Sequence, residues 1–252
     1  RRSGPAVRRS LLAYTADAMQ QGRNSMTDRF LEGRTALVTG STSGIGLAIA
    51  QALAAAGARI AINGLGSSEQ IASAIAGVDA ASDGGTRHFG ADLRDPDAIE
   101  TMMAELATWS GGGIDILVNN AGIQHAVPLH EMPVQKWNDI IAINLSSAFH
   151  TSKAVWPAMK AKKSGRIINI SSVHGLVASE YKSAYVSAKH GIIGLTKVLA
   201  LEGATLGITT NAICPGYVKT PLVEKQIKDQ AKSHNIPDSD VSFHPLLRRS
   251  RV

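Results

Sequence analysis

The sequence has little cysteine and no long apolar segment, and both shortages exclude classes of protein. Its 252 residues contain one cysteine, Cys214, so neither an internal disulfide nor a zinc site with several cysteine ligands can form. No uninterrupted apolar run reaches the length of a bilayer span, and we expect no membrane association. The eight histidines include no HExxH pattern, and we expect no metal site. This composition fits a reducing compartment, and we expect a cytoplasmic protein.

Acidic residues are scarce at the two ends of the chain, and this scarcity explains the net charge of +6. Residues 1–25 carry five Arg and one Asp, and residues 241–252 carry three Arg and no acid, which leaves −1 for residues 26–240. A near-neutral body lacks the basic stripe that binds a phosphate backbone. We therefore expect no nucleic-acid partner.

The two ends also differ from the body in pattern. Residues 1–32 are expected to form an N-terminal extension that is disordered, and residues 241–252 an irregular basic tail. The Arg- and Ser-rich composition of residues 1–25 resembles a transit peptide, which would place the protein in mitochondria. We favour the alternative, an upstream extension in front of Met26.

Between these ends, short apolar runs alternate with longer segments of helical pattern. Strands are expected over 35–40, 59–64, 87–93, 114–122, 165–172 and 209–216, and helices over 44–58, 68–77, 95–110, 133–160 and 183–204. Apolar strands separated by helices are typical of a parallel sheet that is covered on both faces. The pattern predicts a doubly wound, Rossmann-type α/β domain over residues 33–216.

The first expected strand ends in a glycine-rich turn, TGSTSGIG, with glycines at 40, 44 and 46. Glycine lets the backbone approach a pyrophosphate closely, and the helix that follows presents free N–H groups to it. Because the turn joins a strand to a helix, nucleotide binding is favoured over a purely structural turn.

The second expected strand indicates which nucleotide is bound. An acid at its end binds a ribose 2′-hydroxyl, whereas a nearby Arg accommodates a 2′-phosphate. Here the strand ends NGLG (63–66), which offers neither, although Asn63 can still bind a hydroxyl. NAD is therefore favoured over NADP. Asp92 and Leu93, after the third strand, are placed to contact the adenine, with a surface turn as the alternative.

A tyrosine and a lysine lie four residues apart in SAYVSAKHG (183–191) and share one face of an expected helix. A free phenol, with a pKa of about 10, is a poor base at neutral pH. An ammonium group beside it stabilises the phenolate and lowers that pKa. Alone, the pair has an ordinary alternative, a half-buried Tyr185 next to a solvated Lys189.

Five motifs in one order together resemble the short-chain dehydrogenase/reductase family. They are TGSTSGIG, NNAG (119–122), Asn144 in the long expected helix, ISS (170–172) and YVSAK (185–189). The resemblance implies an oxidoreductase in which Tyr185 is the general base and Lys189 its electrostatic partner and a ribose ligand. It further implies that Ser172 orients the substrate oxygen, and that Asn144 supports the helix and holds a water in a relay to Lys189.

The resemblance also implies where a cofactor is held: in the glycine turn, at the strand ends and in the loop after the last strand. The implied contacts are Gly40, Thr42, Gly44, Ile45, Gly46, Asn63, Asp92, Leu93, Asn120, Ala121, Gly122, Tyr185, Lys189, Pro215, Gly216, Val218 and Thr220.

Three longer segments narrow the resemblance to family members that interconvert D-3-hydroxybutyrate and acetoacetate: NNAGIQH, HGLVASEYKSAYVSAKHG and NAICPGYVKTPLVEKQI. The implied substrate contacts are Gln124, Ser172, His174, Lys182, Tyr185 and Gln226. A small hydroxy acid has little apolar surface, so charged and amide donors must orient it. One alternative is a reductase of 3-oxoacyl or acetoacetyl thioesters, which would favour NADPH.

The C-terminal part departs from the family pattern. Residues 217–240 are expected to form a substrate lid. Family members usually continue through another helix and a seventh strand, whereas here SHNIPDSDVSFHPLLRRSRV follows, and we expect the final strand to be missing. The resemblance implies a homo-oligomer, a tetramer, and the missing strand would remove part of its assembly surface. A second alternative is therefore a truncated, catalytically inactive nucleotide-binding subunit.

Overall fold

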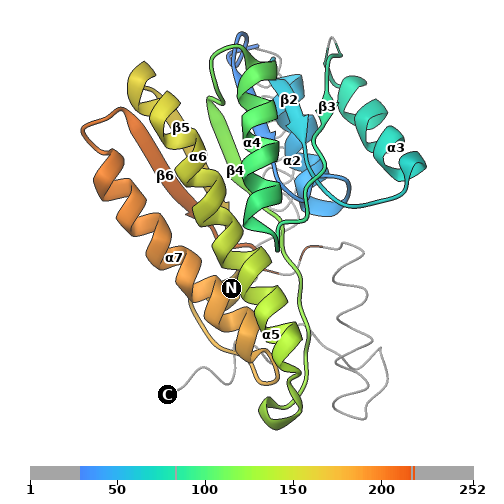
Figure 1. Cartoon of the computed structure of the whole chain (residues 1–252), viewed down its shortest axis with the longest axis vertical. Coiled ribbons are helices and arrows are strands. Elements are labelled where there is room, and N and C mark those ends of the chain that lie inside the picture. Colours follow the sequence, from blue (N-terminus) through green and yellow to red (C-terminus); the bar gives the residue numbers. More distant parts are fainter. Residues whose placement is uncertain (1–28, 83, 217, 219–252) are drawn as a thin grey trace, which may run out of the picture.

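The protein contains a six-stranded parallel sheet. This computed structural model describes residues 29–82, 84–216 and 218. The strands are β1 (Thr35–Val38), β2 (Arg59–Ile62), β3 (Arg87–His88), β4 (Ile116–Asn119), β5 (Gly165–Ile170) and β6 (Ile208–Ile213). They lie in the order β3-β2-β1-β4-β5-β6, and every neighbouring pair is parallel (Figure 1). The predicted doubly wound Rossmann-type fold is confirmed.

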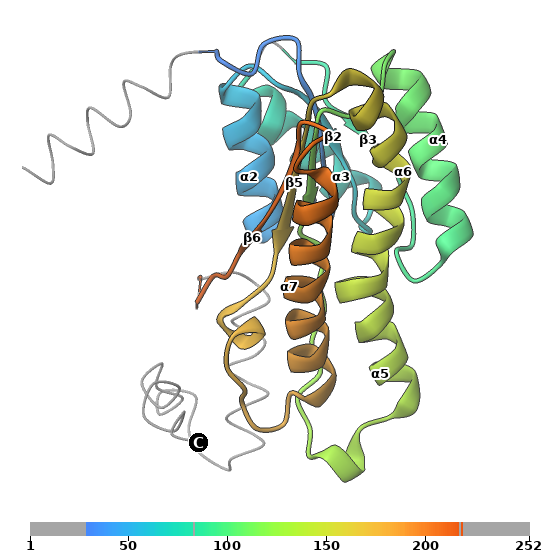
Figure 2. The ribbon, with the colours of Figure 1, turned by 90° about the vertical axis from the view of Figure 1, so that its left-hand side faces the viewer.

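Helices cover both faces of the sheet. They are α2 (Gly44–Ala55), α3 (Ser68–Asp79), α4 (Pro96–Ser110), α5 (Val134–Ile141), α6 (Ser147–Lys162) and α7 (Ser183–Gly203). Successive strand side chains point to opposite faces. Leu37 and Leu117 accordingly pack with α4 and α6, whereas Val38 and Val118 pack with α2 and α3. Figure 2 shows α2 on one side of the sheet and α4, α6 and α7 on the other.

The strand order reverses at β1, which pairs with β2 on one side and with β4 on the other. In open parallel sheets the crevice at such a reversal, at the carboxyl ends of the strands, is where ligands bind. The glycine turn after β1 and the NNAG segment at the end of β4 both lie at this edge. The topology therefore brings together motifs that are about eighty residues apart in sequence.

Most expected elements begin or end within three residues of their observed bounds, and two differ by more. The strand expected over 87–93 is paired only at Arg87–His88, and the backbone N–H of Phe89 makes one further bond, 2.9 Å long, to the Ile62 carbonyl. The helix expected over 133–160 is divided into α5 and α6 by a π-helical segment, η2 (Ala142–Ser146). A π-helical insertion changes which way the side chains within it point, and such insertions are frequent at functional sites.

Residues 1–28 of the N-terminal extension, most of the lid, the basic tail and the missing final strand were predicted for segments that lie outside the described residues. The predicted disorder is wrong for residues 29–32, where Leu31 packs against the core and its backbone N–H donates to the Ala56 carbonyl at 2.9 Å. Within the described part of the chain, no helix has the length and apolar character needed to cross a bilayer.

Candidate active site

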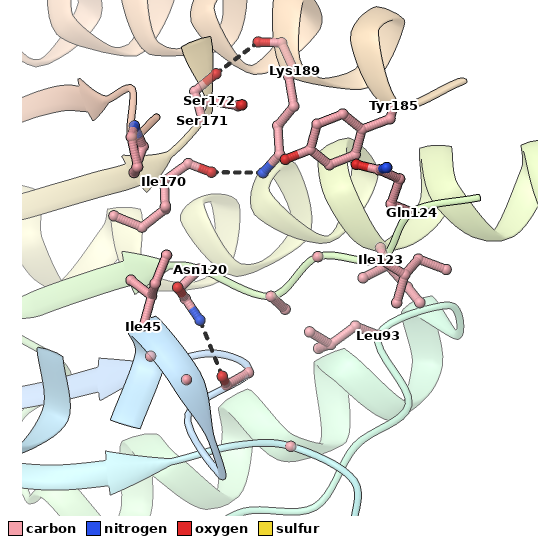
Figure 3. A pocket seen from close by; sticks show the side chains of 18 of the residues that line it. Ile45, Leu93, Asn120, Ile123, Gln124, Ile170, Ser171, Ser172, Tyr185 and Lys189 are labelled. Atoms are coloured by element: carbon pink, nitrogen blue, oxygen red, sulfur yellow. Dashed lines mark hydrogen bonds between the residues drawn. The ribbon is translucent and has the colours of Figure 1, made fainter. Parts of the chain in front are cut away.

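A cavity of about 590 Å³ opens at the strand reversal, and most of the predicted site residues line it. The predicted residues that line it are Gly40, Thr42, Gly44, Ile45, Gly46, Asn63, Asp92, Leu93, Asn120, Ala121, Gly122, Gln124, Ser172, His174, Lys182, Tyr185, Lys189, Pro215, Gly216 and Val218. Figure 3 shows labelled members from the segment after β4, from β5 and the loop after it, from α7 and from the glycine turn around one space. Thr220 and Gln226 lie outside the described residues.

The glycine turn fits closely against the neighbouring backbone. A Cβ on Gly40, whose φ is +62°, would lie 2.8 Å from the Ala121 Cα, and a Cβ on Gly46 would collide with the Gly40 carbonyl and the Asn120 side chain. Helix α2 starts at Gly44, and its N-cap residue, Ser43, makes no side-chain capping bond. The first N–H groups of the helix are thus left for a ligand, an arrangement that suits a pyrophosphate.

Asn120 joins the two walls of this subsite. Its Nδ2 donates to the carbonyls of Thr39 (2.9 Å) and Gly40 (3.0 Å), and its backbone N–H donates to Thr39 Oγ1 (3.0 Å). The NNAG segment is thereby fixed to the glycine turn. The residues present therefore fit a dinucleotide: the start of α2 would hold its pyrophosphate, and the residues after β4 and β5 would hold its nicotinamide end.

Asn63 has a structural role that the sequence did not reveal. Its side chain is buried, with 1% of its surface exposed, and Nδ2 donates to the Phe89 carbonyl at 3.0 Å. Its Oδ1 accepts a long bond (3.5 Å) from the backbone N–H of Gly40. Asn63 thus connects the glycine turn to the chain after β3, and its contact with a ribose hydroxyl stays a prediction.

Asp92 and Leu93 lie at the end of the cavity predicted to receive the adenine. The Nε of Arg94 donates to both carboxylate oxygens of Asp92 at 3.0 Å. Hydrogen bonding to Arg94 holds the pKa of Asp92 below its usual value. Arg94 also lies 3.9 Å from the Asp139 carboxylate on α5, so its charge is directed towards two acids.

Tyr185 and Lys189 lie on the same face of α7, as their spacing predicts, and both line the cavity. Lys189 is 3% exposed, and its Nζ donates to the Ile170 carbonyl at 2.7 Å and lies 5.7 Å from the centre of the Tyr185 ring. Figure 3 shows the phenol oxygen pointing towards this ammonium. Burial lowers the pKa of Lys189 to about 8, and Coulombic attraction to Cys214 opposes that shift.

Ser172 follows β5 and faces the same cavity. Its Oγ accepts a 3.1 Å bond from the backbone N–H of His174 and so caps the short 3-10 turn η3 (Val173–Gly175). The His174 ring packs edge-on against Tyr185, with the ring centres 6.2 Å apart. Ser172, His174 and Tyr185 therefore surround one end of the cavity.

His174 and Lys182 form a buried pair at that end. They are 3% and 2% exposed, and Lys182 Nζ lies 3.3 Å from His174 Nε2. Burial lowers the pKa of Lys182 to about 8. Burial, with the nearby Lys182 charge, lowers the pKa of His174 to about 4, so this ring is neutral at pH 7. Its Nε2 then accepts from the lysine, and the proton is on Nδ1, which has no partner among the described residues.

Asn144 does not line the cavity but supports its wall. It lies in η2 and is 1% exposed. Its Oδ1 accepts from the Ile123 N–H, and its Nδ2 donates to the Ile123 carbonyl, both at 2.9 Å. These two hydrogen bonds to the backbone of Ile123 fix the segment between Gly122 and Gln124. The water relay predicted for Asn144 stays a prediction.

Sequence reasoning missed several residues that line the cavity. They are Ser43, Gly64, Leu65, Ala91, Ile123, Ile143, Ile170, Ser171 and Val173. Most are apolar or act through the backbone, so the sequence carries no chemical signal for them. Ser171 is the exception, because a second polar residue beside Ser172 at the end of a buried strand is a signal that could have been followed.

Comparisons with known proteins agree with this geometry. The family model for short chain dehydrogenases matches residues 34–231. The D-beta-hydroxybutyrate dehydrogenase of Rhizobium meliloti (strain 1021) is 55% identical over 215 residues, covering 85% of this chain and 83% of that protein. A protein of the same name from Cupriavidus necator is 56% identical over 219 residues, covering 87% and 84%.

The fold is likewise similar to that of solved structures. A variant of the actinorhodin polyketide ketoreductase, solved with NADPH, superposes with a TM-score of 0.77 at 34% identity, covering 82% of this chain and 78% of that one. Sequence, sheet order and site geometry lead to the same assignment. The chain belongs to the short-chain dehydrogenase family.

Proposed function

We propose that this protein is an NAD-dependent oxidoreductase that interconverts D-3-hydroxybutyrate and acetoacetate. The observation that carries the proposal is the buried His174–Lys182 pair beside Tyr185, at the end of a cavity that fits a dinucleotide. Two relatives that are more than half identical to this chain bear the corresponding name. A small acid would place its carboxylate at Lys182 and its hydroxyl at Tyr185 and Ser172.

The proton-transfer step follows from the positions of three side chains. A nicotinamide cofactor supplies, when bound, a place for the hydride that leaves the alcohol carbon. In oxidation Tyr185, as the phenolate, accepts the hydroxyl proton. Lys189 stabilises that phenolate because its ammonium lies close to the ring. Ser172 donates to the substrate oxygen and orients it for both directions of the reaction.

The electrostatics at the end of the cavity that contains His174 and Lys182 favour an acidic substrate. Transfer of a charged lysine out of water is unfavourable, and this is why the pKa of Lys182 falls to about 8. A bound carboxylate would offset that cost with a charge-assisted hydrogen bond. The ring of His174 lines the same cavity, and its Nδ1–H is buried without a partner in the described part of the chain.

The proposed preference for NAD rests on the end of β2. Thr42 and Leu65 line the cavity there, and Thr42 Oγ1 donates to the Leu65 carbonyl at 3.4 Å. Among the described residues that line the cavity, the only cations are Lys182 and Lys189, and both serve the opposite end. A 2′-phosphate would therefore bring two charges to a subsite that no cation lines among the described residues.

The experiment is a steady-state assay of NADH formation from D-3-hydroxybutyrate by the full chain. We expect turnover with NAD, much less with NADP, and a Tyr185→Phe variant that has lost at least about 100-fold in kcat, as expected for a lost general base. Tyr181→Phe is the matched control, because Tyr181 does not line the cavity. An unchanged Tyr185→Phe variant would overturn the base assignment.

The same assay separates the rival functions. A reductase of 3-oxoacyl or acetoacetyl thioesters would prefer the thioester and NADPH over the free acid and NAD. A catalytically inactive nucleotide-binding subunit would bind NADH with no turnover of either substrate. We also propose a homotetramer in the cytoplasm; size-exclusion chromatography with light scattering tests the assembly, and fractionation of the source cells tests the compartment.

A further inference from the structure

We propose that Ser171 is a positioning residue of the proton-transfer centre, which holds the backbone of Lys189 against the end of β5. The inference rests on the proposed function only in taking Tyr185 and Lys189 as the centre of proton transfer. It concerns a residue next to Ser172 to which neither the sequence motifs nor the cavity chemistry assigned a role.

The residues of the proton-transfer centre come from two separate elements, which must be fixed relative to each other. Tyr185 and Lys189 are on α7, whereas Ser172 follows β5, and the chain between them runs through η3 and a loop. A displacement of about 1 Å between such groups is enough to cost about 100-fold in rate. Contacts that fix α7 directly against the end of β5 are therefore required.

Two consecutive residues supply these contacts: Ile170, the last residue of β5, and Ser171, the first residue after it. Both bond to Lys189. The Ile170 carbonyl accepts from Lys189 Nζ at 2.7 Å, and Ser171 Oγ donates to the Lys189 carbonyl at 2.9 Å (Figure 3). The first contact uses a main-chain carbonyl, which any residue at position 170 would provide. The second depends on the hydroxyl of Ser171.

Ser171 is itself held firmly enough to act as an anchor. It is 4% exposed, and its backbone N–H donates to the Ile213 carbonyl of β6 at 2.8 Å. Its position also suits this role, because side chains of an extended segment alternate in direction. Ser171 points to the face covered by α7, and Ser172, the next residue, points to the substrate end of the cavity.

Gly175 closes the space around this bond. A Cβ at that position would collide with Ser171 Oγ and come 2.6 Å from the Lys189 carbonyl. Only a glycine lets the η3 turn approach so closely. The Ser171–Lys189 bond is therefore a buried contact at the meeting point of η3, the end of β5 and α7.

The test compares Ser171→Ala with Thr196→Val. Thr196 is on the same helix, about two turns further along, and its Oγ1 accepts from Asn169 Nδ2 at 2.9 Å. Each substitution removes one buried hydroxyl that joins α7 to β5 or to the residue after it. Only Ser171, however, contacts Lys189, whose ammonium lies beside the Tyr185 ring. The control thus reports a general loosening of the helix against the sheet.

The first readout is substrate-independent: ultraviolet titration of Tyr185, obtained by subtracting the spectrum of the same protein carrying Tyr185→Phe. We expect the phenol to ionise at higher pH in Ser171→Ala, because a displaced Lys189 stabilises the phenolate less, and at unchanged pH in Thr196→Val. The second readout is kcat, which we expect to fall about tenfold in Ser171→Ala with KM for the acid nearly unchanged.

If Ser171→Ala lowers only the melting temperature, as Thr196→Val does, Ser171 is merely structural and the inference is wrong. If Ser171→Ala does not fold, Ser171→Cys, of similar size with a weak donor, is measured instead and judged by the same titration. Should the parent protein not oxidise D-3-hydroxybutyrate, the proposed function fails, while the titration of Tyr185 still decides the role of Ser171.

Discussion

Replacement of Lys182 by Met is expected to make the protein more stable at pH 7 and a poorer enzyme. Met keeps most of the side-chain volume but removes the buried charge. The pKa of Lys182 is about 8 in the folded protein, against 10.5 for the ordinary group. At about 1.4 kcal/mol per pKa unit, the charged lysine costs the folded state about 3 kcal/mol at pH 7.

The expected gain is somewhat smaller than this cost. The substitution also removes the 3.3 Å contact between Lys182 Nζ and His174 Nε2, and an unpaired buried acceptor costs about 1 kcal/mol or more. We therefore expect Lys182→Met to raise the free energy of unfolding by about 2 kcal/mol, which corresponds to about 4–8 °C in Tm.

The dependence on pH gives a sharper signature than the gain itself. Between pH 8 and 10.5 the unfolded chain keeps the Lys182 proton that the folded protein has lost, so the unfolded state binds more protons. The stability of the parent protein relative to the variant therefore rises with pH across this window. Lys189 has a similar shift but is present in both proteins, so its contribution cancels.

The assay is urea unfolding followed by tryptophan fluorescence at pH 7, 8, 9 and 10, with Lys153→Met, on an exposed position of α6, as the control. In parallel, KM for D-3-hydroxybutyrate should rise more than about tenfold in Lys182→Met, since a charge-assisted hydrogen bond contributes roughly 1.5–3 kcal/mol. A variant that is less stable at pH 7, with a difference independent of pH, would refute the reasoning.

Two further substitutions test the cofactor end of the cavity. Thr42→Arg places a cation at the subsite where the charge of a 2′-phosphate would otherwise be uncompensated. We expect kcat/KM with NADP to rise at least about tenfold, or about 1.4 kcal/mol. If kcat/KM with NADP did not rise, the account of NAD preference would be wrong. Gly46→Ala puts a Cβ against Asn120 and the Gly40 carbonyl, so calorimetry should show NADH affinity reduced at least about tenfold. Gly194→Ala, on α7 with nothing within 4 Å of the added Cβ, should bind NADH like the parent.

The parts of the site that the sequence predicted are those with local signals. The glycine turn is recognised because the strand, turn and helix are contiguous, and Tyr185 and Lys189 because four residues is the spacing of one helical face. In each case the residues that form the feature are close together in the chain. Their roles can be inferred before the tertiary structure is known.

The parts that were missed depend on contacts between distant segments. Asn63 bonds to Phe89, 26 residues away, and Ser171 to Lys189, 18 residues away, and neither pair leaves a periodic trace in the sequence. The expected helix over 133–160 gives no sign of the π-helical insertion, within which Asn144 bonds to the backbone of Ile123, 21 residues away. Local pattern cannot reveal such tertiary constraints.

The cavity contains two buried lysines near the start of one helix, and their environments differ in a way that explains how both can serve one reaction. Lys189 is already bonded to the Ile170 carbonyl and stands beside Tyr185, where it stabilises a charge that the enzyme itself forms. The Lys182 ammonium contacts only the neutral ring of His174 among the side-chain hydrogen bonds of the described residues, so its charge is compensated by no acid there.

This division implies where selectivity for the substrate lies. Asp92 is the one acid among the described residues that line the cavity, and Arg94 already pairs with it. A substrate carboxylate would therefore supply the negative charge that the Lys182 end lacks, whereas a neutral thioester would leave this buried lysine without a counter-charge. Discrimination between acid and thioester is accordingly expected to depend on Lys182 more than on the size of the cavity.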